Sequence, residues 1–355
     1  NGKMRRRLFV VYCGQQEYDR TSGGDFMQGF QKVVGHQEII THLQNAISMN
    51  KVSHAYLFGG ESGSGKKMMA SLFAMTLQCE KHGVEPCMEC PSCKKAQSQN
   101  HPDIIYVKHE KPNTISIDEI REQLINDVMI KPYSSPYKIY IIDEAQKLTL
   151  QAQNALLKTI EEPPAYAVVM LLADNPDALL PTISSRCVQL NLKPVGDQLV
   201  KDYLMNEMHV PDYQAEVDAS LAQGNIGKAE RIARSPEYEE TLESALRMAK
   251  YADSMPLYEI VETIKKLTAE KDNIDDYFDI FSLWFRDVLL FKATKEVDSL
   301  VFKQELNGIR ERANKSSYEG LEKIIEAIQK ARARLNANVN FDLTMELMFL
   351  TMKEN

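Results

Sequence analysis

A glycine-rich loop in the first quarter of the chain has the residue types that bind phosphate. Residues 60–66 lie between a short apolar run and a helical pattern, and they match the P-loop pattern G-x-x-x-x-G-K-[ST] up to its last position. In such a loop, backbone N–H groups converge on phosphate oxygens at a helix N-terminus, and the lysine reaches the terminal phosphates. We therefore expect a site for ATP or ADP that is formed by Gly60, Gly63, Gly65, Lys66 and Lys67.

The last position of this loop departs from the pattern. Lys67 stands where Ser or Thr would give a hydroxyl ligand to Mg²⁺. An ammonium group at about 4 Å from a divalent cation is repelled by about 8 kcal/mol at an effective dielectric constant of about 20. We therefore expect the loop to hold phosphate and to hydrolyse it poorly.

An acidic pair follows another apolar run. Residues 141–144 read Ile-Ile-Asp-Glu and resemble a Walker B segment. In an active ATPase the aspartate, here Asp143, holds magnesium, and the glutamate, here Glu144, orients the attacking water. The alternative is a strand that ends in solvated acids, and the P-loop earlier in the chain favours the first interpretation.

Four cysteines have the spacing of a metal site. Cys79, Cys87, Cys90 and Cys93 give C-x7-C-x2-C-x2-C, and four thiolates fill a tetrahedral shell with no open position. This pattern predicts a structural Zn²⁺ ion. The alternatives are unrelated buried cysteines and an iron–sulfur cluster, although the spacing does not suit the common clusters.

Arg186 is the next candidate, in the triplet Ser-Arg-Cys at 185–187. An arginine at a strand edge is commonly a surface ion pair. The more specific interpretation is an arginine finger that contacts the nucleotide of a neighbouring subunit. Such a finger raises the rate of nucleotide hydrolysis about 10³–10⁵-fold. His36, His54 and His101 lack metal-like spacing, and we interpret them as ordinary polar or core side chains.

Apolar runs and helical patterns alternate through the first half of the chain, which is typical of a parallel α/β sheet. Ser116 and Glu119 form a possible capping box at the start of one helix. The runs predict strands at 55–58, 104–107, 138–143, 167–173 and 188–190, and helices from 37, from 66 to about 78, at 116–126 and at 151–161.

The pattern changes after Pro194, and from there we predict helices only. Short helices with Gly224 and Gly227 between them precede four longer apolar stripes. The second stripe, around Trp284, is apolar on much of its circumference, which suits a buried or partner-facing helix. The stripes are marked by Ile260, Val261, Ile264 and Leu267, by residues 278–289, by Leu321, Ile324, Ile325 and Ile328, and by Leu343, Leu347 and Leu350.

The composition is that of a globular protein with two or three domains. The chain has 355 residues, 44% of them apolar, and a net charge of −8, which favours protein partners before nucleic acid. We find no run of 18 apolar residues and expect no membrane span. The apolar run after Arg5-Arg6-Arg7 is too short for a signal peptide, and the clustered cysteines fit a reducing cytoplasm.

Together these residues resemble the bacterial DNA polymerase III clamp-loader subunits, and within that family most closely the delta-prime type. The resemblance runs from about residue 30 to the C-terminus and is loosest in the last third. The stretch 154–164 and the Ser-Arg-Cys triplet are its most specific marks. The others are the cysteine cluster and the stretches 34–36, 54–58, 101–103, 142–145 and 180–183.

The resemblance implies an AAA+ fold: a nucleotide-binding α/β domain with a zinc module, a small helical lid and a helical collar. That family opens the sliding clamp and places it on primed DNA, powered by ATP, as part of the cytoplasmic DNA polymerase III holoenzyme, which as a complex is a DNA-directed DNA polymerase and nucleotidyltransferase. The implied ranges are an extension outside the main fold at 1–26, the α/β domain at 27–195 with its zinc module at 79–93, the lid at 196–253 and the collar at 254–355.

The resemblance also implies partners and a role. The collar joins subunits, including gamma/tau and delta, in a hetero-pentameric ring, and the complex contacts the clamp and DNA. A delta-prime subunit acts there as a stator. Its arginine, matched here by Arg186, completes the ATP site of the next subunit, and it need not hydrolyse ATP itself.

Three departures from the active pattern favour such a role. Lys67 replaces the magnesium hydroxyl, Asp174 stands in the place of a sensor threonine, and Gly227 stands in the place of a sensor arginine. Asp143 and Glu144 are then vestigial, while Lys66 leaves nucleotide binding open. The alternatives are an ATP-hydrolysing gamma/tau-like motor subunit and a general AAA+ remodeller or helicase. The second alternative leaves the cysteine cluster and the stretch 154–164 unexplained.

Overall fold

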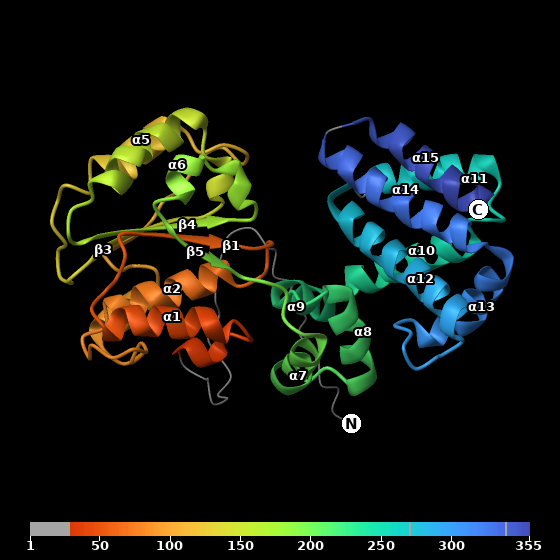
Figure 1. Ribbon diagram of the computed structural model, residues 1–355, viewed down its shortest axis with the longest axis horizontal. Coiled ribbons are helices and arrows are strands. Elements are labelled where there is room, and N and C mark those ends of the chain that lie inside the picture. The colour runs from red at the N-terminus through yellow and green to blue at the C-terminus, as the bar shows by residue number, and fades with distance from the viewer. Residues whose placement is uncertain (1–28, 270, 338) are drawn as a thin grey trace, which may run out of the picture.

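The structure, a computed structural model, describes residues 29–269, 271–337 and 339–355. A sheet with helices on both faces forms the first part, and helices form all of the rest (Figure 1). The extension predicted at 1–26 lies outside the described residues. Among the helices described, none has the length and apolar character needed to cross a membrane.

Five parallel strands form the sheet in the order β2-β3-β4-β1-β5. β1, β3 and β4 are buried along their whole length because helices cover both faces, and their sequences are therefore nearly continuous apolar runs. Each predicted strand is confirmed, with bounds that differ by one residue at most. The strands are β1 (Ala55–Gly59), β2 (Ile104–Tyr106), β3 (Lys138–Ile142), β4 (Ala167–Ala173) and β5 (Val188–Asn191).

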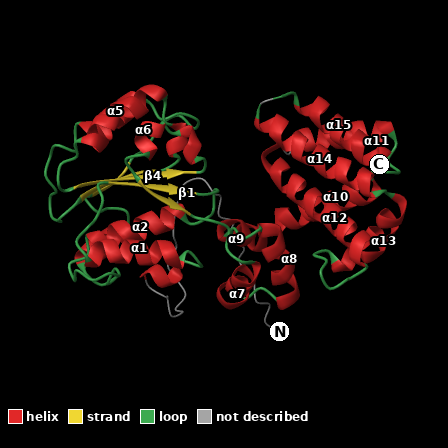
Figure 2. Ribbon diagram, in the orientation of Figure 1, coloured by secondary structure: helices red, strands yellow, loops and turns green. Residues whose placement is uncertain are grey.

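The two faces of the sheet carry separate apolar cores. α1 and α2 lie on one face, and α5 and α6 lie on the other (Figure 2). The helical segments of this domain are η1 (Gly29–Lys32), α1 (Gln37–Ser48), α2 (Lys66–Leu77), α3 (Pro91–Gln97), α4 (Ile117–Ile120), η2 (Arg121–Ile125), η3 (Ala145–Lys147), α5 (Leu150–Glu161), η4 (Pro176–Ala178) and α6 (Pro181–Ser184).

The helix predicted at 116–126 begins as expected and then changes character. Ser116 accepts the backbone N–H of Glu119, and the Glu119 carboxylate accepts that of Ser116, so the capping box is confirmed. After Ile120 the chain continues as the π-helical turn η2.

Three short helices lie between the sheet and a larger helical group (Figure 1). One apolar cluster is continuous from Val200 in the short helices to Met352 near the C-terminus. The domain boundaries at 195 and 253 stay predictions. The helical segments are α7 (Asp197–Met208), α8 (Asp212–Ala222), α9 (Ile226–Arg234), α10 (Pro236–Tyr251), α11 (Leu257–Ala269), η5 (Lys271–Asn273), α12 (Ile274–Thr294), η6 (Lys303–Glu305), α13 (Leu306–Lys315), α14 (Tyr318–Asn336) and α15 (Phe341–Glu354).

The helical part agrees with the sequence in outline and differs in detail. α12, with the fully buried Trp284, packs against α10, α13 and α14, as its apolar circumference indicates. Gly227 does not separate two helices, because it lies in the first turn of α9.

The predicted stripe on α15 is partly wrong. Leu343 and Leu347 are exposed, whereas Met345, Met348 and Met352 are buried. This helix is apolar on more than one face, and its leucines alone therefore mark the wrong side.

Candidate functional site

Three neighbouring strands bring the nucleotide-type residues together. The P-loop follows β1, Asp143 follows β3 and Asp174 follows β4, and these strands are adjacent in the sheet. Because the carboxyl ends of parallel strands meet at one edge, residues far apart in sequence become neighbours there. The edge therefore assembles Lys66, Lys67 and the two carboxylates.

The loop itself has the backbone of a phosphate cradle. Gly60, Gly63 and Gly65 have φ values of 147°, 83° and 96°, in the region that favours glycine. Gly65 is the N-cap of α2, so Lys66 begins the helix. These positions are where the pattern places the bends that turn N–H groups inward.

Lys66 is committed to partners within the protein. Its buried Nζ donates to the carbonyl oxygens of Gly60 at 2.6 Å and Glu61 at 2.8 Å, and to Asp174 Oδ1 at 2.7 Å. A lysine ammonium has three donors, and all three are used. Gln146 holds the Asp174 side chain in place, because its side-chain amide accepts the backbone N–H of Asp174 and donates to Asp174 Oδ2. A phosphate can engage Lys66 only by displacing one of these acceptors.

The position of the magnesium ligand is occupied by a second ion pair. Lys67 Nζ lies 3.1 Å from Asp143 Oδ2, so the carboxylate that would bind a metal ion faces an ammonium. The residues at this position therefore do not fit a magnesium ion. Glu144, expected beside Asp143 as the water-orienting acid, instead pairs with Lys147 at 2.6 Å and with His109 at 3.4 Å.

The N-terminal end of α9 contributes contacts that the sequence did not predict. Asn225 Nδ2 donates to Ser62 O at 2.7 Å, and the Gly227 N–H donates to Gly63 O at 3.0 Å. Asn225 also caps α9 by accepting the N–H of Lys228. An asparagine before a helical pattern indicates an N-cap, but nothing local shows that its amide also reaches the P-loop.

Arg186 lies in the short segment between α6 and β5 and takes no part in the P-loop contacts described above. Its Nη1 donates to Thr182 O at 2.9 Å, and its Nη2 lies 3.0 Å from Glu161 Oε1. The Arg186 and Glu161 side chains are 41% and 46% exposed, respectively. The surface ion pair that was the simpler alternative is therefore present. A pair this exposed contributes only about 0–1 kcal/mol, and an anionic partner can replace Glu161.

The four cysteines converge where the chain leaves α2 and enters α3, and Cys93 lies in the first turn of α3. Their sulfur atoms all lie within 4.8 Å of one another, and Cys87 Sγ is 3.9 Å from Cys93 Sγ. Four sulfurs around a zinc ion at about 2.3 Å stand about 3.8 Å apart, so the arrangement fits a tetrahedral ion. Cys79 and Cys93 are almost fully buried. The set leaves no ligand position open for catalysis.

Backbone groups prepare the sulfurs for a cation. The N–H of Cys90 donates to Cys87 Sγ and lowers the pKa of Cys87 to about 6, and the N–H of Cys93 donates to Cys90 Sγ. Burial raises the pKa of Cys93, a cost that a bound cation offsets because it favours the thiolate.

The cysteine segment is also tied to the rest of the domain. Glu85 accepts the N–H of Phe30 at 2.9 Å and the side-chain amide of Gln44 at 2.6 Å. The hydroxyl of Ser92 donates to Gln78 O at 2.6 Å, next to His101. These contacts indicate a structural role for the segment. They also place His101 in a packed polar cluster, in agreement with its interpretation from sequence.

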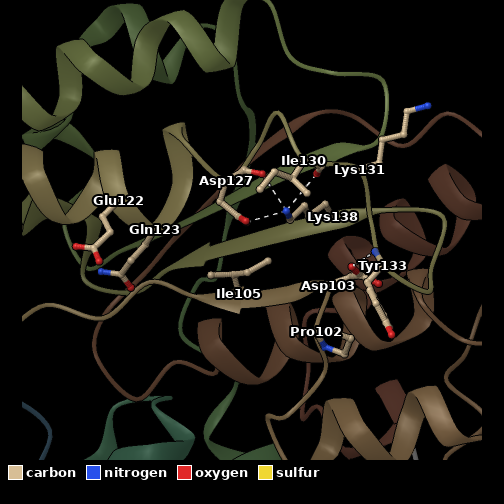
Figure 3. A pocket seen from close by; sticks show the side chains of 10 residues that line it. All are labelled: Pro102, Asp103, Ile105, Glu122, Gln123, Asp127, Ile130, Lys131, Tyr133 and Lys138. Carbon is tan, nitrogen blue, oxygen red and sulfur yellow. Dashed lines mark hydrogen bonds and ion pairs between the residues drawn. The ribbon is translucent and has the colours of Figure 1, made fainter.

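A separate hollow of about 360 Å³ lies beside the edge strand β2 (Figure 3). Its buried cation, Lys138, donates to Asp127 O at 2.9 Å and Ile130 O at 3.1 Å, and it pairs with the Asp127 carboxylate. Asp103 accepts the backbone N–H groups of Tyr133 and Ser134. These charged groups hold the loop before β3 and have a structural role.

Comparison with known proteins identifies the family. A family profile described as DNA polymerase III, delta subunit, matches residues 35–196, and one described as DNA polymerase III, delta subunit, C terminal, matches residues 241–354. The DNA polymerase III subunit delta' of Bacillus subtilis (strain 168) is 31% identical over 316 residues, which cover 88% of this chain and 94% of that protein. The chain belongs to the family of DNA polymerase III clamp-loader subunits.

Other members of this clamp-loader family are also similar. The subunit tau of Bacillus subtilis is 30% identical over 331 residues, 87% of this chain and 58% of that protein. The subunit tau/gamma of Haemophilus influenzae is 39% identical over 204 residues, 56% of this chain and 29% of that protein. The chain therefore spans little more than half of the first protein and under a third of the second.

A solved structure of a gamma subunit-related protein from Thermotoga maritima superposes with a TM-score of 0.47 at 22% identity, over 89% of this chain and 98% of that chain. The expected fold class is confirmed, with a P-loop on a five-stranded parallel sheet, followed by helical groups.

Proposed function

We propose that this clamp-loader subunit is of the delta-prime type, a stator that does not turn over ATP and lends Arg186 to the ATP site of a neighbouring subunit. One observation carries the proposal: both lysines of the P-loop are paired with carboxylates of the same chain, which occupies Lys66, the residue that would reach ATP, and Asp143, the residue that would hold magnesium. Lys66 pairs with Asp174, and Lys67 pairs with Asp143.

The proposed finger has the exposure that its role needs. Arg186 is held at the surface by a half-exposed carboxylate and a carbonyl oxygen. A phosphate of a neighbouring nucleotide offers two charge-assisted hydrogen bonds in place of one, which favours transfer of the guanidinium from Glu161 to that phosphate. Asp143 and Glu144 have no catalytic part in this proposal.

The proposed partners follow from the family. We place the chain in a hetero-pentameric ring with gamma/tau and delta subunits in the cytoplasm, where the ring loads the sliding clamp onto primed DNA. In the same proposal Cys79, Cys87, Cys90 and Cys93 hold one structural Zn²⁺ ion. Metal analysis of the pure chain should give about one zinc per chain.

The test of the finger is the clamp-dependent ATPase of a loader reconstituted with this chain and its partner subunits. Arg186→Ala should lower the rate by at least about tenfold. Glu161→Gln is the matched control, because it removes the same surface ion pair and keeps the guanidinium. An unchanged rate with Arg186→Ala, or an equal loss with both variants, would reject the finger.

The alternative is a gamma/tau-like motor subunit, which the 30% identity to tau over 331 residues supports. A motor subunit requires that Lys66 and Asp143 become free when Mg–ATP arrives. Vigorous ATP hydrolysis by the isolated chain would favour this alternative over the stator.

A further inference from the structure

The N-terminal end of α9 approaches the P-loop more closely than side chains allow. The N–H of Gly227 donates to Gly63 O at 3.0 Å. A Cβ atom at position 227 would lie 2.7 Å from both the Cα and the carbonyl oxygen of Gly63. Real Cβ atoms do not approach backbone this closely, so the contact exists only because both positions are glycine.

Asn225 ties the helix to the loop with a single buried side chain. Its Oδ1 accepts the N–H of Lys228 at 3.0 Å and so caps α9, while its Nδ2 donates to Ser62 O at 2.7 Å. The residue is 6% exposed, so water has little access to either the oxygen or the nitrogen of this amide. The start of α9 and its attachment to the P-loop therefore depend on the same side-chain amide.

The residue before Asn225 fixes the linker from the sheet domain. Gly224 has a φ of +79°, and its carbonyl accepts the N–H of Val195 at 3.0 Å. A Cβ at position 224 would lie 2.4 Å from Val195 O. The segment 224–227 is thus pressed between the linker on one side and the P-loop on the other.

The same helix is held against the C-terminal helices by ion pairs whose carboxylates are largely buried. Arg231 makes two bonds to the buried Asp276 of α12, at 2.6 and 2.7 Å. Lys228 pairs with Asp279, one turn further along α12, and Asp279 also pairs with Arg332 of α14. Removal of one member of such a pair leaves an uncompensated charge, so this end of α9 resists displacement.

We propose that the P-loop of this chain serves as a mechanical joint that receives the N-terminal end of α9 and ties the sheet domain to α12 and α14 without nucleotide. The joint needs no ligand because each contact in it is made by the protein's own atoms. Lys66 and Lys67 are neutralised by Asp174 and Asp143, so the loop keeps its shape with its charges satisfied internally. This role goes beyond the proposed function and does not depend on Arg186.

Hydrogen exchange measured by mass spectrometry on the full chain tests the joint. Gly227→Ala forces the helix off the loop and should speed exchange in 60–66 and 224–231 by at least about tenfold. Gly196→Ala is the matched control, because a Cβ there meets nothing within 4 Å. Addition of Mg–ATP to the unmodified chain should leave exchange in both segments unchanged.

A second variant keeps the test decisive should Gly227→Ala fold poorly. Asn225→Asp retains the oxygen that caps α9 and loses the amide that donates to Ser62 O, so it should raise exchange in 60–66 while α9 stays formed. Equal exchange in Gly227→Ala and Gly196→Ala would overturn the joint. So would a several-fold slowing by Mg–ATP, because nucleotide would then organise the contact.

Discussion

The cysteine cluster and the P-loop lie in the same domain and keep recognisable patterns, yet they differ in what their atoms face. In the cluster, four sulfurs converge within 4.8 Å, and backbone N–H groups donate to two of them. In the loop, Lys66 and Lys67 face carboxylates of the same chain. A motif therefore predicts chemistry only where the residues around it leave its functional atoms available to a ligand.

The largest expected effect comes from the cluster. Structural zinc contributes about 10–16 kcal/mol in small zinc peptides, so Cys93→Ala should lower the free energy of unfolding by at least about 3 kcal/mol and abolish zinc binding. Urea unfolding and metal analysis measure the two quantities. Cys187→Ser, outside the cluster, is the control and should retain about one zinc per chain. If Cys93→Ala keeps its zinc and its stability, the contrast between the two regions disappears.

The second effect comes from restoring the loop. Asp174→Thr combined with Lys67→Ser frees Lys66 and removes the ammonium that repels magnesium. The affinity for Mg–ATP, measured by isothermal titration calorimetry, should rise by at least about tenfold, which is about 1.4 kcal/mol. Asp177→Thr is the control. It removes an exposed acid three residues after Asp174 for which no contact with Lys66 is found among the described residues, and it should leave the affinity for Mg–ATP unchanged. A double variant that binds no better than the unmodified chain would show that the ion pairs do not limit binding.

The smallest expected effect concerns a buried carboxyl group whose partner is an amide. Asp143 and Asp174, by contrast, pair with ammonium groups. Burial raises the pKa of Asp218 in α8 to about 6, and Gln214 donates to it at 2.9 Å. A raised pKa means that the group's contribution to stability is full below about pH 4 and is lost as the pH rises through about 6.

Asp218→Asn should therefore gain stability relative to the unmodified chain as the pH rises. The difference in the free energy of unfolding should grow by about 1 kcal/mol between pH 5 and pH 8. Urea titrations of both proteins at several pH values measure this difference. A difference that does not vary with pH would mean that Asp218 is ionised in the folded protein with an ordinary pKa.

The sequence was sufficient for the elements that rest on local patterns. Buried strands read as apolar runs, and the capping box at Ser116 marks a helix start, so both were predicted correctly. α13 was missed because its ten residues bury only Gly308, Ile309, Arg312 and Ala313, too few apolar side chains for a stripe.

The sequence was not sufficient for contacts that depend on strand order. Lys66 and Asp174 are 108 residues apart and meet only because β1 pairs with β4. The departures at Lys67 and Asp174 were visible in the sequence, but their pairing with Asp143 and Lys66 required the fold. Likewise, the motif predicts that Glu144 acts beside Asp143, whereas in the fold the Glu144 carboxylate faces His109 from the loop after β2.

Steady-state ATP hydrolysis by the purified chain alone tests the central claim most directly. With both P-loop lysines paired to carboxylates, the chain should show no magnesium-dependent turnover above the level of its Lys66→Ala variant. Magnesium-dependent turnover that Lys66→Ala abolishes would contradict the account, because the loop would then open to nucleotide and act on it.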